Sequence, residues 1–210
     1  MLRRPAKKLA RVVVDSLPNA AADWIWQLAN DRRTSQSPDR VVLVQQVFPA
    51  LRRASALSKG ANVLWIGCRR YTRGYYALLE RDGAQCASID IDPFAERWGR
   101  RGRHLVGDIL DLPNIFPTGQ FDAVLCNGVL GWGVDAPADQ LKAFEAMAGV
   151  MAPQGWLLVG WNTDRMDDPL ISGLGAKWFD HIALPEFRER YAVGGCTHVF
   201  DTYRRRADNH

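Results

Sequence analysis

The chain has 210 residues, enough for one domain with a sizeable core and a small extension, but too few for two independent domains. Hydrophobic residues make up 47% of the chain and charged residues 24%, which argues against a disordered chain, a coiled coil or a fibre. The net charge of +4 is too small to establish an anionic partner. Because the arginines are scattered along the sequence, we do not expect nucleic acid to be the partner.

The chain shows no sign of a membrane, secretory or metal-binding protein. No segment approaches the roughly 18 uninterrupted apolar residues that a membrane-spanning helix needs. The apolar run after the basic amino terminus covers only residues 12–14, too short for a signal peptide. The four cysteines are spaced neither as metal ligands nor as a disulfide framework. We therefore predict a cytoplasmic protein with reduced thiols, no transmembrane segment and no bound metal.

Residues 1–60 contain no strand–turn–helix unit. Helical patterns cover residues 6–17, 20–29 and 41–56, separated by breaks such as the polar stretch at residues 34–40. We predict a helical amino-terminal extension over residues 1–60, which packs against or partly covers a second unit formed by residues 61–210. A basic helix near residues 5–17 can alternatively lie on a membrane surface.

From residue 61, short apolar runs alternate with helical patterns. Residues 63–67 predict a buried strand, and Thr72 can cap a helix that stops at Gly83. Further strands are expected over residues 85–90, 104–106, 121–127 and 156–161, with a helix over residues 138–151 before the last of them. Strands separated in this way predict an α/β fold, a mostly parallel sheet with helices on both faces.

Ligands of such sheets bind at the carboxyl ends of the strands. Asp90 follows the second strand, 23 residues after Gly67, where a carboxylate can accept the hydroxyl hydrogens of a ribose. Asp90 can alternatively cap the next turn; Asp92 is the better capping candidate, and the two roles can be exchanged. Asp108 ends the third strand, where it can meet an adenine edge or lie in a solvated loop.

The turn after the first strand lacks the expected glycines. Arg69 and Tyr71 follow Gly67 where glycines would let the backbone approach a cofactor. The chain has neither G-x-G-x-x-G nor G-x-x-x-x-G-K-S/T, the motifs that would predict binding of a nicotinamide dinucleotide or a nucleoside triphosphate. A cofactor without a pyrophosphate demands less of this turn.

Five segments occur in an order that resembles the class I S-adenosylmethionine-dependent methyltransferases, over about residues 61–162. They are NVLWIGCRRY, ASIDIDP, VGDILDLP, FDAVLCNGVL and MAPQGWLLVG. The resemblance implies a Rossmann-like, doubly wound, mostly parallel seven-stranded sheet with an antiparallel last strand, for which residues 197–203 are suited. It departs from the family pattern at Trp65, where an acidic residue is usual, and at Arg69 and Tyr71, which replace glycines.

The resemblance also implies which residues hold S-adenosylmethionine. The turn would approach the methionine moiety, the second strand end the ribose, the third the adenine, and the fourth the region beside the sulfonium. The residues concerned are Gly67, Cys68, Arg69 and Tyr71 in the turn, Asp90 and Ile91, Asp108 and Ile109, and Asn127. Because adenosylmethionine carries a carboxylate, an arginine at 69, 70 or 73 can bind it; alternatively these arginines are surface charge.

Methyl transfer needs positioning and, for a hydroxyl acceptor, a base. His181 and His198 are the base candidates, with Asp135 and Asp164 less favoured. Trp132 and Trp161 can wall an acceptor pocket or close the core. We expect a small-molecule acceptor, such as a sugar or natural-product hydroxyl or amine. The alternatives are a non-catalytic methyltransferase-like binding protein and a protein that binds a phosphate-bearing ligand through its arginine-rich turn.

Overall fold

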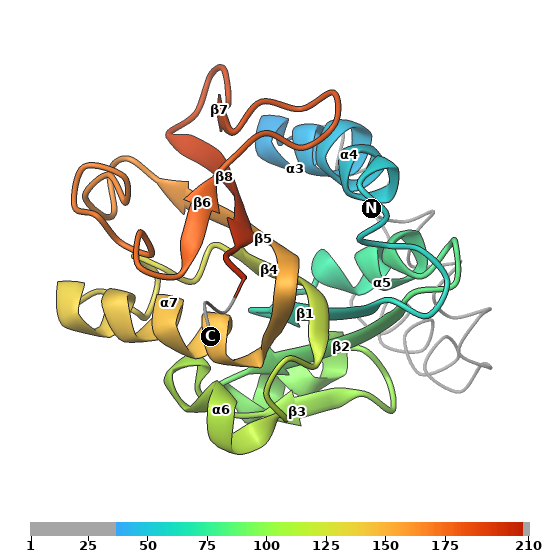
Figure 1. The fold of residues 1–210 in the computed structure, drawn as a ribbon. Coiled ribbons are helices and arrows are strands. Elements are labelled where there is room, and N and C mark those ends of the chain that lie inside the picture. The colour runs from blue at the N-terminus through green and yellow to red at the C-terminus, as the bar shows by residue number, and fades with distance from the viewer. Residues whose placement is uncertain (1–36, 208–210) are drawn as a thin grey trace, which may run out of the picture.

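The computed structural model describes residues 37–207 of the chain, which form an eight-stranded sheet with helices on both faces (Figure 1). The strands are β1 (Asn62–Ile66), β2 (Gln85–Asp90), β3 (His104–Val106), β4 (Phe121–Asn127), β5 (Met151–Asn162), β6 (Phe179–His181), β7 (Arg190–Ala192) and β8 (His198–Arg205). The α-helices are α3 (Pro38–Val42), α4 (Phe48–Arg53), α5 (Tyr75–Leu79), α6 (Leu112–Ile115) and α7 (Pro137–Val150).

The strand order is β3-β2-β1-β4-β5-β8-β6, and β7 also pairs with β8. Strands β1 to β5 are parallel to their neighbours, whereas β8 runs antiparallel to β5. Because β6 pairs with β8 at residues 203–205 and β7 pairs with it at residues 199–201, the two short strands share the outer edge of β8. The mostly parallel sheet with an antiparallel last strand is therefore confirmed, and the sheet is seven positions wide.

Successive side chains of a strand point to opposite faces of the sheet, so the core has two layers. On one face, Val63 and Trp65 of β1 pack with α3, α4 and α5. On the other face, Leu64 and Ile66 pack with α6 and α7. The helices accordingly cover opposite faces of the sheet in Figure 1.

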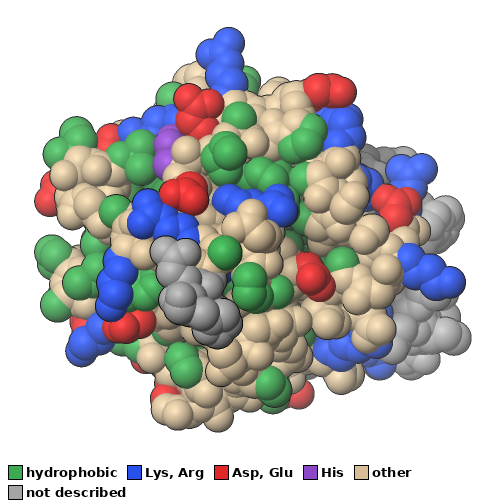
Figure 2. Space-filling view, in the orientation of Figure 1, with side chains coloured by type: hydrophobic (Ala, Val, Ile, Leu, Met, Phe, Trp, Pro, Cys, Tyr) green, Lys and Arg blue, Asp and Glu red, His purple; other side chains and the backbone are tan. Residues whose placement is uncertain are grey.

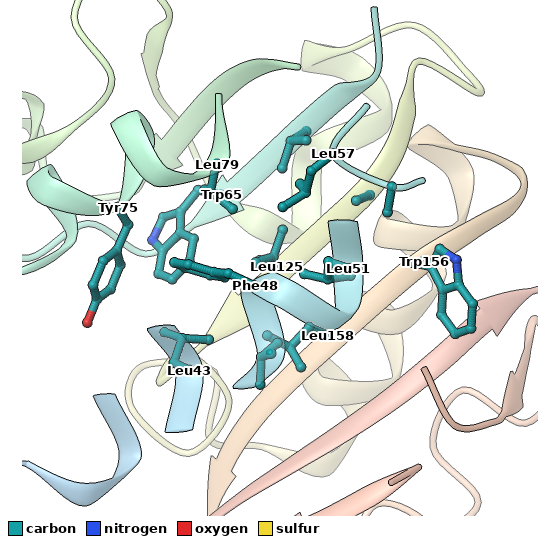
Figure 3. Packing of buried hydrophobic residues seen from close by; sticks show 14 of the residues in the cluster. Leu43, Phe48, Leu51, Leu57, Trp65, Tyr75, Leu79, Leu125, Trp156 and Leu158 are labelled. Carbon is teal, nitrogen blue, oxygen red and sulfur yellow. The ribbon is translucent and has the colours of Figure 1, made fainter. Parts of the chain in front are cut away.

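The predicted helix over residues 41–56 is present as α3, a π-helical turn at Leu43–Val47, and α4. Its Phe48 ring lies edge-on to Trp65 and Tyr75, with ring centroids 6.4 Å and 5.6 Å apart, and Figure 3 shows this packing. This segment therefore belongs to the core beside β1. The other two expected helices, at residues 6–17 and 20–29, lie outside the described residues, and the division at residue 60 stays a prediction.

Several element boundaries differ from the expected ones. The helix expected from Thr72 begins as a 3₁₀ turn at Thr72–Gly74 and continues as the short α5. Strand β5 starts at Met151 rather than at residue 156, because its first residue pairs with Phe121 across a register shift. Strand β8 continues to Arg205. No helix in residues 37–207 is long and apolar enough to cross a membrane.

Candidate cofactor and acceptor site

The turn after β1 strongly favours a glycine. Gly67 has a φ of +86°, and a Cβ added to it would lie 2.7 Å from Cγ2 of Val129, which follows β4. Trp65, which stands where the family carries an acidic residue, is fully buried and donates its indole N–H to the Gly67 carbonyl at 2.6 Å. The indole therefore fixes the carbonyl of the turn from the core side.

Asp90 connects this turn to the end of β2. Its carboxylate is buried and accepts the backbone N–H of Cys68 at 2.6 Å and that of Asp92 at 2.9 Å. Arg69 Nη1 lies 3.1 Å from the same oxygen that Cys68 contacts. Asp92 has the capping role instead, because its side chain accepts the N–H of Phe94 in the turn Pro93–Trp98. Asp92 therefore caps the turn Pro93–Trp98, while Asp90 accepts backbone N–H groups at both of its oxygens and also lines the first pocket.

Of the three arginines near the turn, Arg69 is the one that lines a pocket. Its side chain is 51% exposed, and Nη1 also donates to the Cys68 carbonyl at 2.8 Å. Arg73 is buried and directs Nη1 toward the Arg97 carbonyl at 3.4 Å. Arg70 is exposed and does not line either pocket.

Cys68 points its sulfur into the core, 3.4 Å from the hydroxyl of Tyr76. Burial raises the pKa of its thiol to about 11, so the thiol is neutral at physiological pH. Cys68 therefore contributes its backbone N–H to the turn, and its side chain does not reach a ligand. Unlike Cys68, Tyr71 lines one of the two pockets described below. The Arg40 guanidinium lies 3.8 Å from the centroid of its ring.

A first pocket lies at the carboxyl ends of β1, β2, β3 and β4. Apolar side chains and three carboxylates line it together; its residues are Ile66, Gly67, Arg69, Ile89, Asp90, Ile91, Gly107, Asp108, Ile109, Leu110, Gly128, Val129, Trp132, Gly133, Val134 and Asp139. Ile91 is 66% exposed, whereas Ile109 is buried. Asp108 accepts the Leu110 N–H at 3.0 Å and so caps the following turn while its side chain lines the pocket.

A second, more polar pocket adjoins the first. It is lined by Asp39, Gly67, Arg69, Tyr71, Asn127, Gly128, Trp132, Asn162, Cys196 and His198. The two pockets share Gly67, Arg69, Gly128 and Trp132. A molecule in the first pocket can therefore contact a molecule in the second pocket at this common boundary.

His198 is buried in the wall of the second pocket and is bonded at both ring nitrogens. The indole N–H of Trp132 can only donate, and it donates to Oδ1 of Asn162 at 3.2 Å. The same oxygen lies 3.3 Å from Nδ1 of His198. Nε2 lies 3.0 Å from Oδ1 of Asn127. Because a neutral imidazole has one N–H, which Nδ1 donates to Asn162, Nε2 accepts a hydrogen bond from Asn127 when that amide turns its NH₂ group to the ring. Burial lowers the pKa of His198, which keeps the ring neutral near pH 7. Its nitrogens nevertheless face protein groups rather than the centre of the pocket.

Two predicted site residues lie away from these pockets. Trp161 is buried and donates its indole N–H to Asp201 at 2.8 Å. The strand period directs Trp161 to the opposite face from its neighbour Asn162, which lines the second pocket in its place. His181 lies on β6 with Nε2 3.1 Å from Asp201, so its position does not support a role as base.

The two less favoured base candidates, Asp135 and Asp164, also lie outside both pockets. Asp135 accepts the Gly133 N–H at 3.2 Å, and Asp164 lies 3.9 Å from Arg165. Among residues 37–207, no group of three or more His, Cys, Asp or Glu side chains can hold a metal ion. On the face shown in Figure 2, the basic side chains are interspersed with acidic and apolar ones.

Four residues that line the second pocket were not predicted from the sequence: Asp39, Gly128, Asn162 and Cys196. Asp39 lies in the polar stretch that the pattern marks as a break between helices, and nothing in that stretch signals a pocket. Asn162 ends β5, at the edge where ligands bind, and the alternation of the strand was the signal that could have distinguished it from Trp161.

Residues 64–159 match the family described as "Methyltransferase domain". Comparison with curated proteins gives no match. The fold is similar to a TehB-like SAM-dependent methyltransferase from Corynebacterium glutamicum, with a TM-score of 0.56 and 16% identity over 85% of this chain and 99% of that chain.

Two further solved structures have a similar fold. The N-methyltransferase NodS from Bradyrhizobium japonicum has a TM-score of 0.54 and 19% identity over 77% of this chain and 98% of that chain. The 1,6-didemethyltoxoflavin-N1-methyltransferase of Burkholderia thailandensis has a TM-score of 0.54 and 17% identity over 99% and 92%. Residues 64–159 therefore match a methyltransferase domain, and the fold is that of S-adenosylmethionine-dependent methyltransferases. The matched domain and the fold indicate S-adenosylmethionine as the cofactor.

Proposed function

We propose that the chain is an active methyltransferase that transfers the methyl group of S-adenosylmethionine to a small molecule. The observation that carries the proposal is the pair of adjoining pockets, which share Gly67, Arg69, Gly128 and Trp132. One pocket then holds the adenosine part of the cofactor and the other holds the acceptor. The sulfonium methyl group would lie at their common boundary, where an in-line approach is possible.

The first pocket suits an adenosine. The exposed Ile91 and the buried Ile109 provide apolar surfaces for a flat base, and Asp108 lines the same pocket, where an exocyclic amine can be bound. Asp90 is placed for the ribose, as proposed from its position after β2. A dinucleotide would need further glycines in the turn, whereas the nucleoside part of adenosylmethionine does not.

Arg69 has a specific role in this proposal. In the structure its guanidinium contacts Oδ2 of Asp90, the carboxylate proposed for the ribose. The carboxylate of adenosylmethionine offers the guanidinium a second partner of the same charge as Asp90. We therefore propose that Arg69 exchanges Asp90 for the cofactor carboxylate, which leaves the aspartate to the ribose.

The acceptor is placed in the second pocket, against Tyr71, Asn127 and Trp132. Two of the structural neighbours are named as N-methyltransferases, and one of them was solved with bound 1,6-didemethyltoxoflavin and S-adenosylhomocysteine. These names support a small-molecule acceptor here. A cytoplasmic location stays a prediction from the sequence.

The alternative is a non-catalytic methyltransferase-like protein, and the contact between Arg69 and Asp90 favours it. A phosphate-binding turn has less support, because Arg73 is directed away from the pocket. Mass spectrometry of the denatured, freshly purified chain tests these alternatives by detecting copurified adenosylhomocysteine. A parallel thermal-shift measurement compares adenosylmethionine and adenosylhomocysteine with ATP as the control. We expect the first two to raise the melting temperature; no copurified ligand together with no shift would refute the enzyme proposal.

A further inference from the structure

Asp39 is the one carboxylate among the described residues of the second pocket. It lies in the first turn of α3, is half-buried, and accepts a hydrogen bond from the hydroxyl of Ser37. The opposite wall of the pocket is formed by Asn127, Asn162 and His198, which come from the ends of β4, β5 and β8. The segment before the sheet thus places a negative charge opposite the strand ends.

The charge of Asp39 is not matched by the other charged side chain of the pocket. Arg69 is already paired with the buried Asp90, at 3.1 Å. Arg40 lies over the Tyr71 ring and does not line the pocket. Burial lowers the pKa of His198, and the charge of Asp39 acts against this effect, so the carboxylate is close enough to influence that ring. Asp39 therefore gives the second pocket a carboxylate that forms no ion pair with another described residue, which favours a cationic group beside it.

We propose that the methyl acceptor is a basic amine and that Asp39 is the residue that selects it. This inference rests on the methyl-transfer function proposed above and identifies the acceptor class. A carboxylate binds an N–H group or an ammonium by a charge-assisted hydrogen bond and repels an anionic acceptor such as a carboxylate or phenolate.

The reaction balances with an amine. The ammonium form first loses one proton to solvent water. The nitrogen lone pair then forms the new C–N bond while the C–S bond breaks, and the electrons of that bond remain on sulfur. The products are the neutral thioether adenosylhomocysteine and a methylated ammonium ion. Positive charge therefore moves from sulfur to nitrogen during the transfer, and a carboxylate beside the nitrogen stabilises it as it arrives.

A hydroxyl acceptor fits the pocket less well. Its oxygen has to lose a proton as the new bond forms, and this requires a base directed at the acceptor. Both ring nitrogens of His198 are bonded to Asn127 and Asn162, so the imidazole is not directed at such a proton. A nearby carboxylate also raises the cost of forming an alkoxide, because the two negative charges repel each other.

The test uses three probes of nearly the same shape that differ in charge: benzylamine, benzyl alcohol and benzoate. Binding to the full chain is measured by saturation-transfer NMR, with and without saturating adenosylhomocysteine. Wild-type protein is expected to bind benzylamine best and benzoate least. In Asp39→Asn, the loss of a charge-assisted contact should weaken benzylamine binding about fivefold or more, whereas benzyl alcohol binding stays within about twofold.

The matched control is Asp164→Asn, which removes one exposed negative charge outside both pockets. It should leave benzylamine binding unchanged. Adenosylhomocysteine affinity should be the same in wild type and Asp39→Asn, which also shows that the variant is folded. The inference is overturned if benzylamine binds no better than the other two probes, or if Asp39→Asn and Asp164→Asn weaken it equally. A failure of adenosylhomocysteine to bind would instead refute the proposed function, since the amine preference is also measured without it.

Discussion

Replacing Arg69 by alanine distinguishes a turn that binds the cofactor from one that blocks it. The side chain makes one ion pair with Asp90 at 3.1 Å and is 51% exposed, so the pair should contribute less than about 1 kcal/mol to the free energy of unfolding. Asp90 also keeps its backbone donors, the N–H groups of Cys68 and Asp92. We therefore expect Arg69→Ala to fold normally, with a melting temperature lowered by less than about 4 °C.

The effect on cofactor affinity should be much larger. If Arg69 binds the carboxylate of the cofactor, its removal deletes a charge-assisted contact worth about 1.5–3 kcal/mol, or about 10- to 150-fold in affinity. Calorimetric titration with adenosylhomocysteine measures this change. Arg70→Ala is the control, because it removes the same charge from a neighbouring exposed position that lines neither pocket. Unchanged or tighter binding by Arg69→Ala would show that Arg69 does not bind the carboxylate, and tighter binding would show that it blocks the site.

Three further substitutions test the turn and the second pocket. Gly67→Ala should cost about 1–3 kcal/mol in urea unfolding, because φ is +86° and the new Cβ meets Val129; an unchanged midpoint would contradict the close approach. Trp65→Phe removes the donor to the Gly67 carbonyl and should also cost about 1–3 kcal/mol, with weaker adenosylhomocysteine binding in calorimetry. Because burial holds the pKa of His198 below its ordinary value of 6.5, the unfolded chain binds more protons below that pH, and stability falls as the pH is lowered. His198→Gln should reduce this fall in urea titrations between about pH 7 and 5, whereas an identical pH profile would show that His198 is not buried neutral.

The fold and the location of the site could be predicted from the sequence because both depend on the order of the strands. The apolar runs at residues 104–106 and 121–127 correspond to β3 and β4. Once the strands are parallel, their carboxyl ends share one edge of the sheet, and Asp90, Asp108 and Asn127 come together there. No side-chain geometry is needed for this step.

Side-chain directions and partners could not be predicted in the same way. The resemblance places Cys68 at the cofactor, but the turn directs its sulfur to Tyr76 in the core. Trp161 and Asn162 are adjacent in sequence, and the pairing of β5 with β4 decides which of them faces the ligand edge. The contact between Arg69 and Asp90 joins residues 21 positions apart and depends on the conformation of the turn. Asp39 reaches the pocket only because α3 and α4 pack beside β1.

A crystal structure of the full chain with adenosylhomocysteine tests the central claim most directly. We predict adenine against Ile91 and Ile109, the ribose hydroxyls on Asp90, and the Arg69 guanidinium moved from Asp90 to the carboxylate of the ligand. The account would be contradicted by a nucleoside bound elsewhere on the molecule, or by an empty first pocket at saturating ligand with Arg69 still paired to Asp90.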